Sequence, residues 1–174
     1  MNLSDFRVVE AAGGFCRVEK PHFSWKLRSD QRDTKQIKFE LVILKDEKTI
    51  ARAAGEGECV YILPEGEALA PRTQYEARLT VEDNHGCRAE ETLVFETDKL
   101  SEPFAAKMIA PQEAPAPVYA LRGKFTAKKP VRSARLYATA LGLYECYFGG
   151  KKAGDSYFAP FWTSYSHTLE YQTY

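Results

Sequence analysis

Three pairs of closely spaced acids are the first residues that could do chemistry, because two carboxyl groups held several ångströms apart on a rigid scaffold can act together, one as a general acid and one as a base or nucleophile. The pairs are Glu56 with Glu58, Glu65 with Glu67, and Glu90 with Glu91. All lie in expected turns or on alternating strand faces. Only the first pair could share a face, and its neighbouring glycines favour solvated charge. We therefore predict no catalytic residue in this chain.

Histidines and cysteines are too scattered to suggest a metal site or a nucleophile. His22, His85 and His167 have no carboxylate at metal-ligand spacing, so we expect surface or turn histidines, no metal and no cofactor. Cys87 follows His85 by two residues, but strand neighbours of this kind rarely converge as thiol and base.

The four cysteines form no C-x-x-C pair. We expect free, buried thiols, with two disulfides as the alternative for an exported chain; the residues are Cys16, Cys59, Cys87 and Cys146.

Aromatic residues gather near the end of the sequence, where flat rings could stack on sugars or pack against protein. They are Tyr157, Phe158, Phe161, Trp162, Tyr165, Tyr171 and Tyr174. Packing is the favoured interpretation. The candidates for sugar stacking or interdomain contact are Tyr157, Phe161, Trp162 and Tyr165.

Composition excludes several classes of function. The chain of 174 residues is 44% hydrophobic, and its 24 basic residues balance its 24 acidic ones, so nucleic-acid binding lacks its electrostatic signature. No apolar run is long enough to span a membrane. The first residues carry neither a basic start nor an apolar stretch for export, so we expect a cytoplasmic protein.

Alternating apolar residues predict strands in the first part of the chain. Such strands are expected at Phe23 to Leu27, where Pro21 precedes the strand, at Ile37 to Ile43, at Thr49 to Ala53, and at Val60 to Ile62. The charged run 45–48 should form a hairpin turn. A loop is expected at Pro64, Glu65 and Gly66.

A long strand with Tyr75, Ala77, Leu79 and Val81 on one face should follow, and its first tyrosine suggests a tyrosine corner. A turn at 84–86 then leads to a last strand through Thr92, Val94 and Glu96. About seven short strands predict an all-β fold, an immunoglobulin-like sandwich nearer the fibronectin type III variety, over residues 1–98. A Pro-rich linker is expected over 99–117, marked by Pro103, Pro111, Pro115 and Pro117.

Residues 118–174 predict an incomplete second β-sandwich. Strands are expected at 121–125, 135–141 and 143–148, with Gly149 and Gly150 closing a hairpin into Lys151 and Lys152. Such a small number of strands cannot close two sheets over a core, and an open strand edge could pair with a second copy as a homodimer.

Four blocks in one order carry a family resemblance: ARLYATALGLYE at 134–145, GD at 154–155, APFWTSY at 159–165 and YQTY at 171–174. They resemble the amino-terminal region of bacterial α-L-rhamnosidases of glycoside hydrolase family 78. Residues 21–100, with FSW at 23–25 and FET at 95–97, are similar to the fibronectin-like domain that precedes this region in many members. The family usually has Asn-Gly where this chain has Gly149 and Gly150.

The resemblance implies a parent glycosidase that hydrolyses terminal α-L-rhamnose with acidic residues on a large helical toroid downstream. Residues 1–174 would then be a non-catalytic N-terminal fragment that supports the catalytic domain of the same polypeptide, its main partner, with a rhamnose-containing glycan as a second one. Two alternatives remain: a self-standing module that binds carbohydrate or protein, and a small hydrolase. No nucleic-acid or membrane partner is expected.

Overall fold

The computed structural model describes residues 1–58, 61–112 and 118–174, and divides them into two compact units. Unit 1 is Met1–Glu102 and unit 2 is Pro103–Tyr174, so the division falls inside the predicted linker. Its last residues, 113–117, lie outside the described part. All regular structure in the described residues is β-strand, and no helix there is long and apolar enough to cross a membrane.

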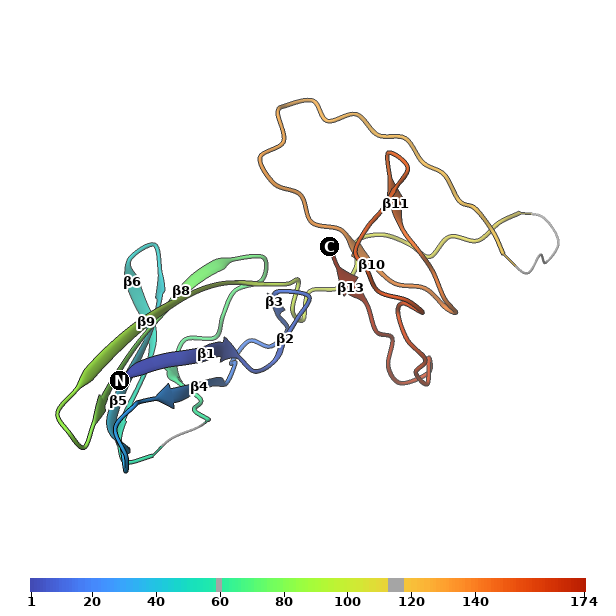
Figure 1. Ribbon diagram of the computed structural model, residues 1–174. Helices are drawn as coiled ribbons and strands as arrows, with labels where there is room; N and C mark the ends of the chain where they lie inside the picture. Colours follow the sequence, from blue (N-terminus) through green and yellow to red (C-terminus); the bar gives the residue numbers. More distant parts are fainter. Residues whose placement is uncertain (59–60, 113–117) are drawn as a thin grey trace. The chain divides into compact units, whose positions relative to one another are not determined.

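Unit 1 contains two sheets that face each other across one core (Figure 1). Strands β1 (Asn2–Val8) and β4 (Phe23–Arg28) form an antiparallel pair. The second sheet has the order β2-β3-β9-β8-β5-β6-β7. Its long strands are β5 (Gln36–Lys45), β6 (Lys48–Glu56), β8 (Gln74–Asp83) and β9 (Arg88–Thr97), and its short ones are β2 (Ala11–Ala12), β3 (Phe15–Cys16) and β7 (Glu65–Gly66). The predicted all-β sandwich is confirmed.

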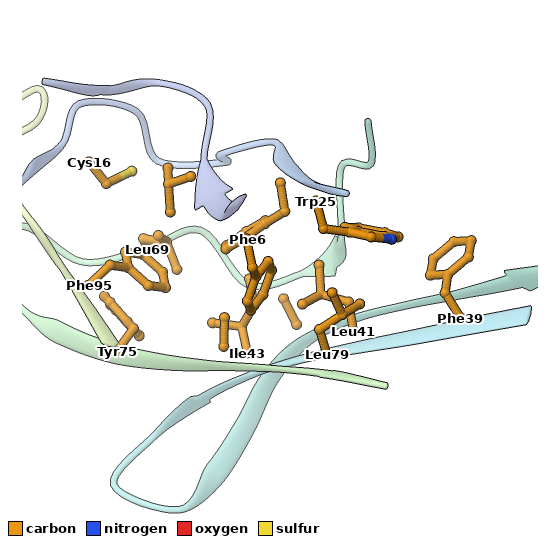
Figure 2. Close-up of a cluster of buried hydrophobic side chains, with 14 of the residues drawn as sticks. Phe6, Cys16, Trp25, Phe39, Leu41, Ile43, Leu69, Tyr75, Leu79 and Phe95 are labelled. Carbon is orange, nitrogen blue, oxygen red and sulfur yellow. The ribbon is translucent and has the colours of Figure 1, made fainter. Parts of the chain in front are cut away.

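The core of unit 1 is apolar and rich in aromatic rings (Figure 2). Phe23 packs edge-on against Phe95 with 5.7 Å between ring centroids, and Trp25 lies 5.4 Å from Phe39. These contacts join β4 of the first sheet to β9 and β5 of the second. Burial of such rings, roughly 25 cal/mol per Å² of apolar surface, is what holds the two sheets together.

The alternation read from the sequence is correct for most strands of unit 1. Tyr75, Ala77, Leu79 and Val81 all face the core from β8. The hairpin turn between β5 and β6 places Asp46 and Glu47 at φ of 49° and 65°, the left-handed conformation that a two-residue hairpin requires.

Three expectations for unit 1 are wrong. Ile37 is 42% exposed, because a bulge in β5 opposite β8 places an extra residue in the strand and turns Gln36 inward instead. Glu65 and Gly66 form β7 rather than a loop. Of the predicted strand at 60–62, Ile62 makes a single bridge to Phe23, and Val60 lies outside the described residues.

In the described residues of unit 2 the strands are all short. β10 (Tyr137–Ala138) pairs with β13 (Gln172–Thr173), and β11 (Tyr147–Phe148) pairs with β12 (Lys151–Lys152) across the predicted Gly149–Gly150 turn. The predicted strand at 121–125 is wrong: residues 118–136 run as a long loop (Figure 1). In place of the strands predicted at 135–141 and 143–148, the structure has the shorter strands β10 and β11. Each pairs with one short strand, which gives it little support for a longer extended segment.

Burial differs sharply between the two units. In the described part of unit 2 the buried residues are Ala159, Pro160, Gln172 and Thr173. Large apolar side chains are exposed throughout it, among them Ile109, Val118, Phe125, Val131, Leu141, Leu143, Phe158 and Trp162. The described residues of unit 1 include far fewer exposed ones: Val9, Ile37, Tyr61, Leu63 and Val94. The described residues of unit 2 therefore enclose no apolar core of their own.

Candidate functional site

A short loop of unit 2 presents three aromatic side chains outward. We call residues 158–162 the aromatic loop. Phe158, Phe161 and Trp162 are 71%, 55% and 90% exposed, whereas Ala159 and Pro160 between them are buried. Hydrogen bonds fix its backbone: the Tyr144 amide donates to the Ala159 carbonyl at 2.8 Å, the Phe161 amide donates to the Phe158 carbonyl at 2.9 Å, and the Gln172 side-chain amide donates to the Pro160 carbonyl at 3.5 Å. The Ala159–Pro160 peptide is cis.

The other predicted aromatic candidates lie in different surroundings. Tyr157 is 73% exposed, and the Lys152 ammonium sits 4.5 Å from its ring centroid in a cation–π arrangement. The Tyr165 hydroxyl accepts a 2.8 Å hydrogen bond from the Gly142 amide, so this ring is tied into the unit. Tyr171 packs edge-on against Phe104 at 5.7 Å. The aromatic group read from the sequence is thus partly outward-facing and partly internal packing.

A charged cluster lies beside Tyr157. The Glu145 carboxylate accepts hydrogen bonds from the Lys152 ammonium at 2.7 Å and from the Tyr147 hydroxyl at 2.6 Å. These donors, Lys152 foremost, lower the pKa of Glu145, and the carboxylate in turn raises the pKa of Lys152 and of Tyr147. The signal for this cluster in the sequence was the predicted hairpin turn at Gly149 and Gly150, because the pairing of β11 with β12 sets Tyr147 opposite Lys152.

A polar cluster lies inside unit 2 behind the aromatic loop. The Tyr144 hydroxyl lies 2.8 Å from Gln172 Oε1, 3.1 Å from the Ala138 carbonyl oxygen and 3.4 Å from the Tyr174 hydroxyl. Burial, reinforced by Tyr174, strongly raises the pKa of Tyr144. The phenol therefore stays neutral and joins β10 to β13, which makes it a structural group.

The acid pairs do not form a catalytic arrangement. Glu91 is half-buried, and the remaining five pair members, Glu56, Glu58, Glu65, Glu67 and Glu90, are solvent-exposed. Glu90 bonds Arg88, its neighbour on β9, at 3.0 Å. Within residues 1–58, 61–112 and 118–174, no group of three His, Cys, Asp or Glu side chains could hold a metal ion.

His22 belongs to a cluster that sequence reasoning missed. Its Nδ1 lies 2.6 Å from Glu10 Oε1, its amide donates to Glu10 Oε2 at 2.9 Å, and its ring stacks on Tyr61 at 4.2 Å. Burial opposes ionisation of Glu10, but the hydrogen bonds from His22 outweigh it and lower the pKa of the carboxyl. The sequence predicted a surface or turn histidine, whereas His22 is half-buried and its partner lies twelve residues away on the turn after β1.

His85 and Cys87 serve a turn rather than a reaction. The amides of both residues donate to the Asp83 carboxylate at 2.9 Å, which closes the β8–β9 connection. Of the cysteines, Cys16 is buried, Cys146 is half-buried and Cys87 is exposed, and all three are free. The expectation of burial is therefore wrong for Cys87, and Cys59 lies outside the described residues.

Unit 1 is an immunoglobulin-like β-sandwich: it has facing sheets, an aromatic core and a tyrosine corner, in which the Tyr75 hydroxyl accepts a hydrogen bond from the Ala70 amide. The family model "Rha78A-like, N-terminal immunoglobulin domain" matches residues 13–101, just over half of the sequence, and the chain belongs to this family. A second family model, "Alpha-L-rhamnosidase N-terminal domain", matches residues 129–174 of unit 2. The resemblance stated from the sequence is confirmed in both units.

Individual relatives agree. A curated α-L-rhamnosidase of Streptomyces avermitilis is 54% identical over 46 residues, which are 26% of this chain and 4% of that protein. The solved α-L-rhamnosidase of Dictyoglumus thermophilum matches with a TM-score of 0.84 and 24% identity over 100% of this chain and 23% of its own. The native enzyme of Aspergillus terreus matches with a TM-score of 0.80 and 24% identity over 99% and 21%. The two structural matches concern the fold, and this chain spans less than a quarter of each relative.

Proposed function

We propose that the chain is the non-catalytic N-terminal part of an α-L-rhamnosidase and gives architectural support to a glycoside hydrolase domain of the same polypeptide. The family models match N-terminal domains in both units, and the relatives extend far beyond the matched regions. Five of the six members of the predicted acid pairs are solvent-exposed, which agrees with a supporting role.

The observation that carries this proposal is the uncovered apolar surface of unit 2. A folded domain rarely leaves so many large apolar side chains in water beside so few buried ones, and abundant exposed apolar surface is typical of an interaction site. Further polypeptide of the same parent is the simplest cover. Unit 1, with its own core, would be an independent module attached to it.

The proposal also includes the cellular compartment and the variety of the unit 1 sandwich. The free Cys16, Cys87 and Cys146 support a reducing compartment, as in the cytoplasm. Among the described residues no disulfide links the sheets of unit 1, and the Tyr75 corner is present, which favours the fibronectin type III variety of the sandwich.

Capture of the native product tests the proposed function. An antibody against residues 1–98 should retrieve from the source cells a species that hydrolyses a chromogenic α-L-rhamnoside, while the purified chain of residues 1–174 should not. Captured material without rhamnosidase activity would contradict the proposal. Turnover by residues 1–174 alone would contradict it as well, and would favour the small hydrolase.

One observation favours a second candidate, a carbohydrate-binding module. The exposed Tyr157 ring lies beside the Glu145–Lys152 pair, and a flat ring with polar groups next to it is the arrangement that binds sugars. Saturable binding of a rhamnoside by residues 1–174, lost in Tyr157→Ala and kept in Tyr119→Ala, would support this candidate.

A further inference from the structure

The aromatic loop shows an unusual division between its middle and its ends. Ala159 and Pro160 are buried and hold the loop against Tyr144, while the rings of Phe158, Phe161 and Trp162 point into solvent. Packing the two small residues and leaving the three large rings in water is the reverse of what burial of apolar surface favours. The loop is therefore arranged for contact with something outside the described chain.

Backbone conformation supports this interpretation. Phe158 and Phe161 have φ of 57° and 81°, in the left-handed region that bulky residues seldom adopt. Strained conformations of this kind persist where the surrounding structure fixes them, and they cluster at sites of recognition. Here the backbone hydrogen bonds from Tyr144 to Ala159 and from Phe161 to Phe158 stabilise this conformation of the loop, from which the three rings extend into solvent.

The side chains of the aromatic loop are suited to contact with an apolar protein surface rather than with a sugar. The indole N–H of Trp162 is the loop's one side-chain polar group, whereas a sugar needs several convergent donors and acceptors. A protein interface core, by contrast, is depleted in charge and enriched in aromatic residues. Tryptophan in particular is enriched among the residues that contribute most to binding.

The lengths of the relatives indicate which polypeptide contacts the aromatic loop. The fold of this whole chain is contained in two rhamnosidases of which it covers only 23% and 21%. Resting on the proposed function, we infer that the aromatic loop is the docking surface for the part of the parent rhamnosidase that lies outside this chain, with the Trp162 indole buried in that contact.

Residue-resolved hydroxyl-radical labelling of two unmodified proteins tests the inference: the parent enzyme and the chain of residues 1–174. Trp162 should react rapidly in residues 1–174 and severalfold more slowly in the parent. Trp25, which is 4% exposed, gives the lower limit, and the half-exposed Tyr61 of unit 1 normalises the radical dose. Equal Trp162 labelling in both proteins would overturn the inference and leave the proposed function standing. A native product of only 19.7 kDa would contradict both the inference and the proposed function.

Two other occupants give distinct results, and each would overturn the inference. Protection of Trp162 that grows with the concentration of residues 1–174 would identify a second copy. Protection by added L-rhamnose would identify a sugar site.

A matched pair of variants gives an independent readout. Trp162→Ser should lower the melting temperature of the parent and leave that of residues 1–174 unchanged, because the indole is solvated in the shorter chain. Ser156→Ala, just before Tyr157, is the control and should be neutral in both. An unchanged melting temperature of the parent Trp162→Ser variant would count against the docking contact.

Discussion

The Tyr75 hydroxyl accepts a 2.7 Å hydrogen bond from the Ala70 amide, across the corner that leads into β8. The Tyr75 ring is buried and lies 5.7 Å from Phe95. One side chain thus contributes to the core through its ring and satisfies a backbone donor through its hydroxyl.

Tyr75→Phe should destabilise unit 1 by about 1–3 kcal/mol, because the ring still packs while the Ala70 amide loses its acceptor. Urea unfolding followed by circular dichroism measures the change. Tyr157→Phe is the control and should be neutral, since that ring is largely exposed. Equal stability of Tyr75→Phe and the wild type would show that the corner bond contributes nothing.

The Glu10–His22 contact should make stability depend on pH. The pKa of Glu10 is lowered from its ordinary value of 4.5, so the ionised carboxylate favours the folded state. This stabilisation is complete above pH 4.5 and is lost as the pH falls through the lower folded value.

Glu10→Gln should therefore be less stable than the wild type at neutral pH, and the difference should shrink in acid. Thermal melts between neutral and acidic pH measure it, with Glu65→Gln on the exposed β7 as the control. A constant difference at every pH would rule out an electrostatic origin.

The close contact between β7 and β6 requires a glycine at position 66. Its φ is 153°, and a Cβ at this position would overlap the Ile50 carbonyl oxygen and the Ala51 backbone. Gly66→Ala should cost about 1–3 kcal/mol from strain and displacement of the edge strand.

Gly86→Ala separates the two causes. Gly86 also has positive φ, at 79°, but a Cβ there would meet nothing within 4 Å. Its cost should be smaller, about 1 kcal/mol, because only the left-handed backbone is penalised. If the two variants lost equal stability in urea unfolding, steric overlap at β6 would not be the cause.

The thiols should differ in reactivity. Burial raises the pKa of Cys16 to about 11, so this thiol is neutral and shielded, whereas Cys87 is exposed. A disulfide reagent at mildly alkaline pH should modify Cys87 within the native protein and Cys16 only after unfolding. Peptide mass spectrometry distinguishes them, and native modification of Cys16 at the rate of Cys87 would contradict the burial.

Sequence reasoning succeeded in unit 1 wherever one strand determined its own pattern. The alternation in β8 and the turn chemistry at Asp46 and Glu47 are local, and both were predicted. Ile37 was misplaced because its bulge depends on how β5 pairs with β8. The His22–Glu10 pair was missed for the same reason, since the fold alone brings these residues together.

Unit 2 was harder to predict because its short strands receive little local signal. Leu121 and Phe125 have the spacing of a strand, but no partner strand pairs with them in the described residues. The sequence indicated the aromatic residues as a group, and only the structure separates the exposed Phe161 and Trp162 from Tyr171, which packs within the unit. Exposure is a property of the assembled chain and cannot be read from residue type.

The mass of the native product tests the central proposal most directly. An antibody against residues 1–98 should detect in the source cells a species several times heavier than 19.7 kDa, as expected for the N-terminal part of a rhamnosidase. A native species near 19.7 kDa would contradict the account and favour the self-standing binding module.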